Sequence, residues 1–481
     1  MKKIIISALV FFISTGVFAQ QSMPLNLKVR TTRSIPSFGF QAGCNLTLTS
    51  IICDTSNPKG YNYIIMAKDD NGKEITLDFS QLKDAPVTCV PENKDEYWYI
   101  KSIQKTLVSL SNMRNAYELR NKAENSANQY INTLRSNALI LDDPFLVSYL
   151  NSLLVRINPT QRLDFFKYNT KVIVVKSEEP NAGIYPNGSL LINAGMLARV
   201  HTEDELVALL CHEANHFICN HYLDNMAKIQ KRETAGAIGS AILGAAAGFM
   251  TGSASLGISA ADLALEVGKQ LNKMITAMGL AFNQTQEKEC DKAAVELLPL
   301  LGYDVNGMAT CIKAIGDYYM EEGNLAAYYK SGSHPKIEDR IAATGVPYER
   351  RDSTFEKKMA PCVSYVANEL YGKGRYTQAM EYVNRNITNH VGRGMDYYIK
   401  GECLLATEDT EESNLEAKES LLVAKESYFN KSAAIKALVI ADVRLGSKDE
   451  AVELLNELIS MKSISEADLT WGQSMLQNLA F

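Results

Sequence analysis

The chain has 481 residues, a formal net charge of −6 and 22% charged residues. That length is enough for about three domains at roughly 150 residues each. The charge is close to balance and no basic block is present, so nucleic-acid binding has no electrostatic footprint in this sequence. The composition is that of an ordinary globular protein.

The first 19 residues have the composition of an export signal. Lys2 and Lys3 precede an apolar run, and 17–19 supplies Ala19 where a signal peptidase would cut. The apolar core is short and small polar residues follow it, which favours a cleaved signal peptide over a retained N-terminal anchor. No cysteine lies at the cleavage point, which argues against a lipoprotein. We therefore expect an exported protein.

Residues 20–105 alternate apolar and polar side chains and are rich in Thr, Asn and Gly. Segments 61–66 and 74–79, separated by Asp-Asp-Asn-Gly at 69–72, predict a β-hairpin. We interpret 20–105 as a small β-rich module whose role the sequence does not disclose.

The nine cysteines are an odd number, so at least one thiol is unpaired or pairs outside the chain. Cys44, Cys53 and Cys89 cluster in the first hundred residues, where an oxidising compartment would permit one bridge. Spacing does not select a pair. The remaining six lie in helical-looking segments and are expected to be small buried hydrophobic residues.

The next region changes from helical to mixed periodicity. Residues 99–156 have helical spacing of Leu and Ala, whereas 171–175 and 189–193 read as strands around a turn at 186–188. Thr202 is predicted to cap a long helix, with Glu205 completing a capping box.

Residues 234–261 carry no charge and consist mostly of Ala, Gly, Ile, Leu and Ser. Their length alone would allow a membrane span. The high Gly and Ser content and weak hydrophobicity favour a soluble or surface-docked helical pair over insertion. Peripheral membrane contact through this segment is an expectation of the sequence.

From residue 349 onward the chain is helical with a repeat-like pattern. Gly374 and Gly446 each precede a helix with Ala near its start, and their separation is close to two periods of a tetratricopeptide repeat. The middle unit, 398–424, would be stretched by an acidic loop at 408–416. An unrelated helical bundle is the alternative.

The stretch 209–216 contains His212-Glu213-Ala214-Asn215-His216. Two histidines four residues apart lie on one helix face, about 40° from each other, so both imidazoles can reach one ion. Glu213 flanks that ion and can take a proton from water without being a ligand. HExxH therefore predicts a zinc-dependent hydrolase, whereas a helix with two surface histidines is the bland alternative.

A catalytic zinc needs three protein ligands and one open position. Glu287 is the candidate third ligand, and Asp291, four residues on, shares its predicted helix face. One can bind zinc while the other holds a ligating imidazole by its far nitrogen, although a solvated acidic helix start would look the same. His221 would lie about 180° from His212 on a continuous helix, so we do not expect it to bind the same ion. Cys219 is interpreted as packing.

These motifs resemble those of the gluzincin metallopeptidases of family forty-eight, which include the CAAX prenyl proteases and the bacterial HtpX-like proteases. The segment from His212 to His221 resembles the family's extended HExxH motif. Residues 287–291 resemble its E-x-x-A-D block, with Cys290 where Ala is usual. The resemblance covers about 110–345. It is closest to periplasmic members that carry C-terminal tetratricopeptide repeats and act in envelope protein quality control.

The resemblance assigns roles to further residues. It implies Glu287 as the third zinc ligand, with one zinc ion per chain, and Asp291 as the residue behind a ligand. The run from Asn181, Ala182 and Gly183 through Pro186 to Gly195 resembles the edge strand that pairs with an extended substrate. The block 333–335 with Arg340 resembles the one that closes the catalytic domain. By similarity, His334 covers the metal or bonds the intermediate, and Arg340 stabilises the oxyanion.

The sequence thus predicts an α+β, mostly α fold. Residues 1–19 are the signal peptide, 20–105 the β-rich module, 106–348 a gluzincin zinc-protease domain with a small β-sheet, and 349–481 a tetratricopeptide-like helical domain. The expected activity is that of a zinc metalloendopeptidase acting on misfolded or stalled envelope proteins, with a protein partner on the repeats and no nucleic acid. The alternatives are a chaperone or assembly factor whose zinc site is latent under His334, and a membrane-embedded protease.

Overall fold

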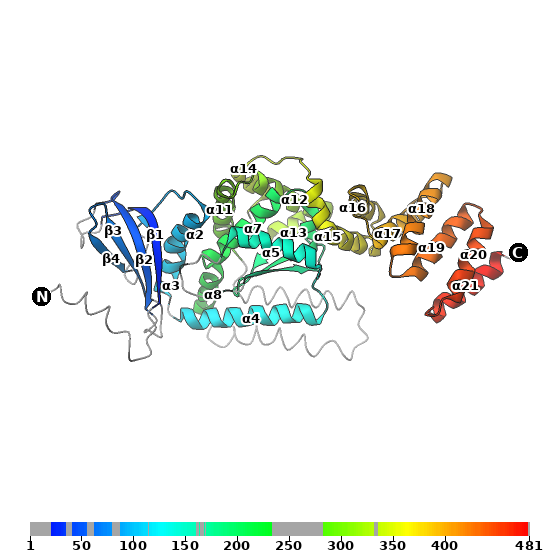
Figure 1. The fold of residues 1–481 in the computed structure, drawn as a ribbon, viewed down its shortest axis with the longest axis horizontal. Helices are drawn as coiled ribbons and strands as arrows, with labels where there is room; N and C mark the ends of the chain where they lie inside the picture. The colour runs from blue at the N-terminus through cyan, green and yellow to red at the C-terminus, as the bar shows by residue number, and fades with distance from the viewer. Residues whose placement is uncertain are drawn as a thin grey trace.

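The computed structural model describes residues 21–34, 41–54, 62–78, 87–113, 115–159, 163, 168, 170–232, 282–330 and 335–479. A β-sheet, a central mixed region and a helical array follow one another along the long axis of the molecule (Figure 1). The fold is α+β and mostly helical, as predicted. The signal at 1–19, the uncharged stretch 234–261 and His334 lie outside the described residues.

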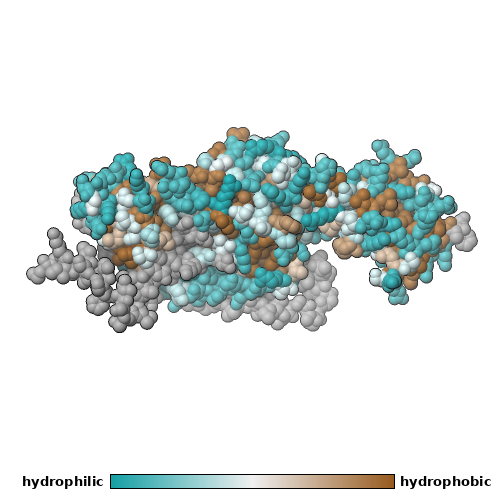
Figure 2. Space-filling view, viewed as in Figure 1, coloured by the Kyte–Doolittle hydropathy of each residue, from teal (hydrophilic) through white to brown (hydrophobic). Residues whose placement is uncertain are grey.

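The molecular surface mixes hydrophilic and hydrophobic side chains. Figure 2 shows teal and brown side chains intermingled over the central region and the C-terminal array. Among the residues that the structure describes, no helix combines the length and apolarity needed to cross a bilayer.

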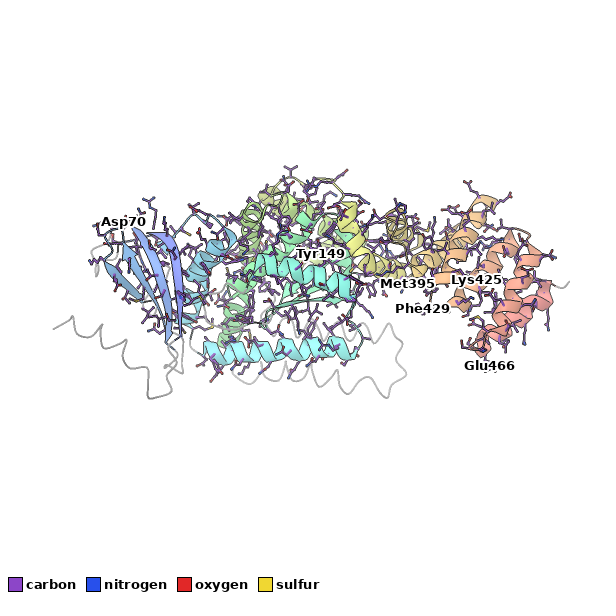
Figure 3. All side chains as sticks on the ribbon, viewed as in Figure 1. Asp70, Tyr149, Met395, Lys425, Phe429 and Glu466 are labelled. Atoms are coloured by element: carbon purple, nitrogen blue, oxygen red, sulfur yellow. The ribbon has the colours of Figure 1, made fainter. Side chains whose placement is uncertain are left out.

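The N-terminal module is an antiparallel five-stranded sheet in the order β4-β3-β2-β1-β5. Its strands are β1 (Gln21–Thr31), β2 (Asn45–Asp54), β3 (Asn62–Asp69), β4 (Glu74–Asp78) and β5 (Val87–Thr88). The predicted hairpin is confirmed as β3–β4, with Asp70 at its tip in Figure 3. The Asp69 carboxylate accepts hydrogen bonds from the backbone of Asn71 and Lys73 at 2.9 and 2.8 Å, which stabilises the turn.

The cysteines follow the burial pattern expected from the sequence. No disulfide joins Cys44, Cys53 or Cys89 in the structure. The six others are buried, as predicted.

Helices connect the module to the central region. They are α2 (Lys94–Lys101), the π-helix η2 (Ser102–Leu107), α3 (Val108–Asn112), α4 (Ala116–Ser136) and α5 (Pro144–Ile157). The helical region begins at Lys94, a few residues before the predicted start. The Trp98 indole donates a 2.8 Å hydrogen bond to the carbonyl of Ile157, which ties α2 to the end of α5.

The central sheet has three strands in the order β6-β8-β7. Strands β6 (Lys171–Val175) and β8 (Ser189–Asn193) are parallel, and β7 (Ala182–Ile184) pairs with β8 as an antiparallel hairpin. Gly188, with φ of +81°, occupies the predicted turn, where a left-handed conformation favours glycine. Strand β7 therefore forms one edge of this sheet.

The described residues that follow the sheet, up to Thr344, form seven helices. They are α6 (Ala194–Arg199), α7 (Glu203–Ile218), α8 (His221–Arg232), α11 (Gln284–Leu301), α12 (Gly307–Glu321), α13 (Leu325–Lys330) and α14 (Ile337–Thr344). Helix α7 is buried from Glu205 to Ile218 because α11, α12 and β7 pack around it. Thr202 caps α7 as predicted, and the Glu205 carboxylate accepts from the Thr202 hydroxyl at 2.8 Å.

The C-terminal region is an array in which each helix packs against the next. Its helices are α15 (Ser353–Gly372), α16 (Tyr376–Thr388), α17 (Gly394–Thr407), α18 (Glu411–Ser427), α19 (Lys431–Arg444), α20 (Lys448–Ser460) and α21 (Glu466–Leu479). The predicted acidic loop at 408–416 is wrong because α18 starts at Glu411. Thr410 caps that helix, and Glu411 and Glu412 lie in its first turn, where negative charge is favourable.

Besides a small hydrophobic cluster between α4 and the central sheet, two hydrophobic cores run through the described chain. The larger begins at Leu27 in the β-sheet, continues through the central region and ends at Cys403 in α17. The smaller begins at Leu404 and holds the rest of the array together. The central region is thus continuous in its packing with both the β-module and the first helices of the array.

Candidate active site

Helix α7 carries both histidines of the predicted motif on one face. The Nε2 atoms of His212 and His216 lie 3.2 Å apart, and the side chains are 4% and 1% exposed. The i, i+4 spacing puts the two rings one above the other on the helix. Their nitrogen atoms therefore point toward one common position, as predicted.

Helix α11 brings Glu287 to the same position. Its start is fixed by a capping box, in which the Asn283 side chain accepts from the backbone of Gln286. The Glu287 carboxylate lies 3.4 Å from Nε2 of His216 and 3.8 Å from Nε2 of His212. One ligand atom from each of the three buried side chains lies within 4.8 Å of the others. Two imidazoles and a carboxylate are the donor set of a catalytic zinc, so these residues fit that ion.

Asp291 lies behind His212, one turn beyond Glu287. Its Oδ1 is 2.9 Å from Nδ1 of His212, and both oxygens accept from Arg340 at 2.8 and 2.7 Å. Burial alone would raise the pKa of Asp291, but contacts with His212 and Arg340 lower it to about 2. Arg340 also donates to the Tyr328 hydroxyl at 3.4 Å. The Arg340 guanidinium is thus engaged with Asp291 and Tyr328.

Glu213 lies between α7 and the central sheet. It is 7% exposed, and its Oε2 accepts a 3.3 Å hydrogen bond from the backbone N–H of Ile184 in β7. Burial raises the pKa of this carboxyl to about 7; nearby His212 opposes the rise and Glu287 adds to it. A carboxyl with such a pKa can accept and return a proton near neutral pH.

The residues predicted to bind substrate follow the edge of the sheet. Ala182 and Gly183 lie in β7, Pro186 lies in the turn that follows, and the Asn181 carbonyl accepts from the backbone of Asn193 at 2.9 Å. The structure therefore places these four residues on or beside the strand that contacts Glu213.

Gly195 lies at the start of α6, close to the chain segment that leads into β7. A Cβ at this position would lie 1.8 Å from the carbonyl oxygen of Glu178. Glycine is thus required where α6 passes the approach to the edge strand.

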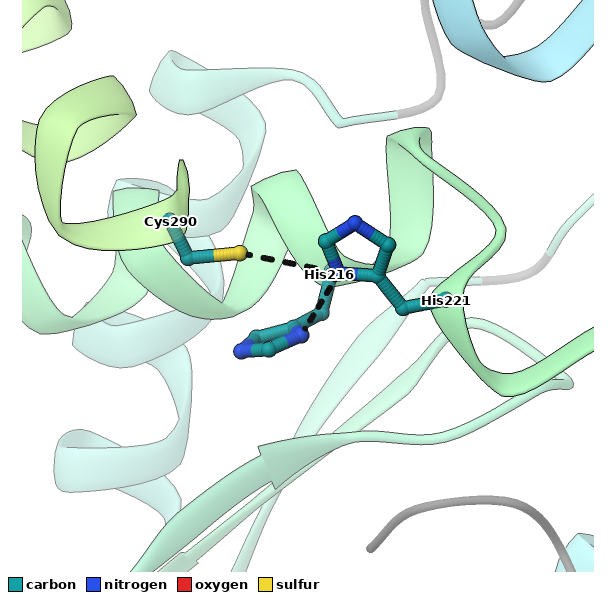
Figure 4. A group of neighbouring side chains, drawn as sticks. All are labelled: His216, His221 and Cys290. Atoms are coloured by element: carbon teal, nitrogen blue, oxygen red, sulfur yellow. Dashed lines mark hydrogen bonds between the residues drawn. The ribbon is translucent and has the colours of Figure 1, made fainter. Parts of the chain in front are cut away.

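His221 is brought to the site by a break in the helix. The expectation of a continuous helix through His221 is wrong: α7 ends at Ile218, and Asn220 has a left-handed φ of +57°. The chain turns back, so Nδ1 of His221 lies 2.9 Å from Nδ1 of His216 and 3.8 Å from Sγ of Cys290 (Figure 4). Sequence reasoning missed this contact; the Asn before His221, a residue that tolerates the left-handed region, is the signal for it.

Phe282 also escaped the sequence analysis. Its ring stacks on the His216 ring, with centroids 3.7 Å apart and planes inclined by 17°. It lies just before α11, and its apolar ring shields one face of a proposed ligand.

Comparison with known proteins agrees with this geometry. Residues 150–345 match the family described as "Peptidase family M48". This range contains His212, Glu213, His216, Glu287, Asp291 and Arg340.

Named relatives each match less than half of this chain. A putative beta-barrel assembly-enhancing protease of Vibrio cholerae is 24% identical over 49% of this chain and 45% of its own length. The beta-barrel assembly-enhancing protease of Escherichia coli K12 is 26% identical over 44% and 41%. The mitochondrial metalloendopeptidase OMA1 of Schizosaccharomyces pombe is 24% identical over 40% and 50%. The matched part spans half or less of these relatives. Residues 150–345 accordingly resemble the metallopeptidase domains of family M48.

Proposed function

We propose that this protein is a zinc-dependent endopeptidase that hydrolyses peptide bonds of extended polypeptides. His212, His216 and Glu287 would hold one zinc ion, which when bound lowers the pKa of water and polarises a carbonyl. The observation that carries the proposal is the convergence of these three side chains with Glu213 between them and the edge strand.

Glu213 is the proposed general base. It takes a proton from the attacking water and returns it to the leaving amine, a role that requires a carboxyl able to change protonation state. Its burial, its raised pKa and its position beside the proposed ligand His212 support this assignment. The sequence led us to expect that Arg340 stabilises the oxyanion. Its contacts with Asp291 support another role, and we propose that Arg340 holds this carboxylate against His212.

Strand β7 is the proposed docking edge for substrate. A peptide laid antiparallel or parallel to β7 would form main-chain hydrogen bonds and extend the sheet, a mode that depends little on side-chain identity. The Ile184–Glu213 hydrogen bond links this edge to the proposed base, so a peptide bound there lies beside the reacting groups.

Envelope proteins are the proposed substrates. The export signal predicted at 1–19 supports a periplasmic or secreted location, and two relatives carry the name beta-barrel assembly-enhancing protease. The array, proposed to be tetratricopeptide-like, would bind a client or partner protein. Its exposed apolar side chains support this: Phe429, after α18, is 88% exposed (Figure 3). Leu415 and Leu422 of α18 are also exposed.

The test compares wild type with Glu213→Gln. Both proteins should bind about one zinc per chain, and the variant should cleave unfolded casein at least about 100-fold more slowly, the minimum typical loss of a general base. Zinc is quantified by mass spectrometry and cleavage by gel. Glu203→Gln, at the start of the same helix and bonded to Tyr149 and Tyr303, is the matched control and should cleave normally.

Two outcomes would overturn the proposal. If the wild type binds no zinc, the ligand assignment fails. If both proteins bind zinc and neither cleaves, His334→Ala opens the site under the latent-site alternative; continued absence of cleavage would favour a chaperone or assembly factor acting through the array.

A further inference from the structure

The ring of His216 is held in its plane but needs a second contact to fix its orientation. The stacked Phe282 ring restricts the plane of the imidazole. A half-turn about the Cβ–Cγ bond keeps the ring in that plane but would replace Nε2 by a carbon at the position shared with Glu287 and His212. A polar partner on the opposite side of the ring decides between the two orientations.

Such a partner exists in a chain of three side chains behind His216. Nδ1 of His216 is 2.9 Å from Nδ1 of His221, and Nε2 of His221 is 3.5 Å from Oε2 of Glu289. The other Glu289 oxygen is 2.9 Å from Nζ of Lys105 in η2. His221 is buried, so its ring nitrogens depend on these protein groups for hydrogen bonds.

When His216 binds a metal, only one placement of the hydrogens satisfies the contacts from His216 through His221 to Glu289. Its Nε2 must offer a lone pair, so its hydrogen is on Nδ1 and is donated to His221. Nδ1 of His221 then accepts, and the hydrogen of His221 is on Nε2, directed at the Glu289 carboxylate that Lys105 holds. We propose that His221, Glu289 and Lys105 are positioning residues that fix His216 for metal binding. This inference rests on the proposed function.

The same pattern argues against a second metal site nearby. Cys219, His221 and Glu289 have potential ligand atoms within 4.8 Å of one another, as do His216, His221 and Cys290. In the proposed tautomer neither nitrogen of His221 has a lone pair to spare, and the ammonium of Lys105 already faces Glu289. Among the described residues, the arrangement therefore leaves a single metal position.

The arrangement repeats the support of the other histidine. His212 contacts Asp291, whose partner is the cation Arg340. His216 contacts His221, then Glu289, whose partner is the cation Lys105. Each of the two proposed histidine ligands is therefore backed by a carboxylate that a cation holds, and the extra imidazole spans the longer gap behind His216.

The experiment compares His221→Leu with His221→Asn in the purified protein. Leu and Asn are similar in size, but only Asn puts an acceptor oxygen where Nδ1 of His221 lies. Zinc affinity is measured by competition with a chromophoric chelator at fixed pH. We expect Leu to weaken zinc binding about 10- to 100-fold, the usual effect of losing a partner behind a ligand, and Asn to restore most of it. Glu289→Gln, which keeps the shape of the side chain, should reduce zinc affinity by a smaller factor.

The controls separate this inference from the proposed function. Cobalt-substituted protein should show an altered visible spectrum for the Leu variant alone, a change that a packing defect away from the metal would not cause. Cys219→Ser should leave the zinc content at one per chain. Equal zinc affinity for wild type, His221→Leu and Glu289→Gln would overturn the inference while leaving the peptidase proposal intact, as would two zinc ions per wild-type chain. A wild type without zinc would instead remove the proposed function.

Discussion

Arg340 is a buried cation whose charge is matched by buried carboxylates. Its Nη2 atom lies 2.7 Å from Asp291 and 3.7 Å from Glu287. Removing the cation would leave two buried negative charges without their partner, which costs much more than losing a surface ion pair. The residue therefore contributes to folding as well as to the proposed site.

Replacement of Arg340 by Met tests this at the level of one side chain. We expect the free energy of unfolding of the metal-free protein to fall by about 3–5 kcal/mol, because a buried ion pair is broken. Urea unfolding at pH 7 measures the change. Arg135→Met, on the exposed side of α4, should change it by less than about 0.5 kcal/mol. Similar decreases in the free energy of unfolding for Arg340→Met and Arg135→Met would show that the buried ion pair of Arg340 adds no special stability.

For individual residues, the sequence predicts those neighbours that helical spacing alone determines. His212 and His216 share a face because they are four residues apart, and a third ligand was expected from the carboxylates Glu287 and Asp291. The position of His221 could not be predicted, because it depends on one left-handed residue, Asn220, that ends α7. The orientation of Arg340 toward Asp291 depends on how α14 packs, which no local pattern encodes.

Helices α15 and α16 meet the start of α7 through a buried carboxylate. Glu356 of α15 accepts hydrogen bonds from Nδ1 of His201 at 2.7 Å and from the Asn389 amide at 2.8 Å. Nε of Arg385 lies 3.3 Å away, and the same guanidinium donates to the carbonyls of Ala198 and Val200 at the end of α6. These contacts join the first helices of the array to the peptidase domain.

The junction predicts a dependence of stability on acid. Burial opposes ionisation of Glu356, but His201, Arg385 and Asn389 lower its pKa to about 2, from 4.5 for a free glutamate. A lowered folded pKa gives stability that is present above about pH 4.5 and is lost as the pH falls toward 2. Glu356→Gln should therefore be less stable than wild type at pH 7, by roughly 3 kcal/mol.

Thermal unfolding of both proteins from pH 7 to pH 3 provides the measurement. The two melting temperatures should draw closer below about pH 4.5, because Glu356 then binds a proton in the unfolded wild type and part of its stabilising contribution is lost. Glu412→Gln, at the exposed start of α18, is the control and should show no such convergence. If the difference in melting temperature between wild type and Glu356→Gln stays constant over this pH range, the shape of the Glu356 side chain, not its charge, accounts for its contribution to stability.

Element boundaries were predicted unevenly from the sequence. Strands β6 and β8 and the turn at Gly188 were found because β-branched runs and Pro-Asn-Gly are strong local signals. The segment 408–416 was misread because its acidic residues resemble a solvated loop, although the same residues suit the first turn of a helix capped by Thr410.

The peptidase domain and the array share a core across the predicted boundary at 348/349. Phe355, Met359 and Val363 of α15 are buried in the larger core, which ends only at Cys403. Periodicity could predict that the array is helical, but the sharing of a core is a property of tertiary packing. The position of the physical boundary therefore had to come from the structure.

Two truncations test where the peptidase unit ends. A chain stopped at residue 348 loses the buried face of α15 and should aggregate or bind zinc poorly. A chain stopped at residue 409 keeps the helices through α17 and should be soluble and retain wild-type zinc affinity. Solubility and zinc competition measure both. Equal solubility and equal zinc affinity of the two truncated proteins would support an independent domain beginning at residue 349.

The paired supports of the two histidines have an electrostatic consequence for the metal. Within about one side chain of the site, four carboxylates face two permanent cations, which leaves an excess of two negative charges when all are ionised. The carboxylates are those of Glu213, Glu287, Glu289 and Asp291, and the cations are Lys105 and Arg340. When Glu213, whose pKa is raised to about 7, is ionised, a bound divalent ion would make this group of charges neutral, whereas a monovalent ion would leave it negative. The charges of the protein therefore favour a divalent ion, independently of any preference for particular ligand atoms.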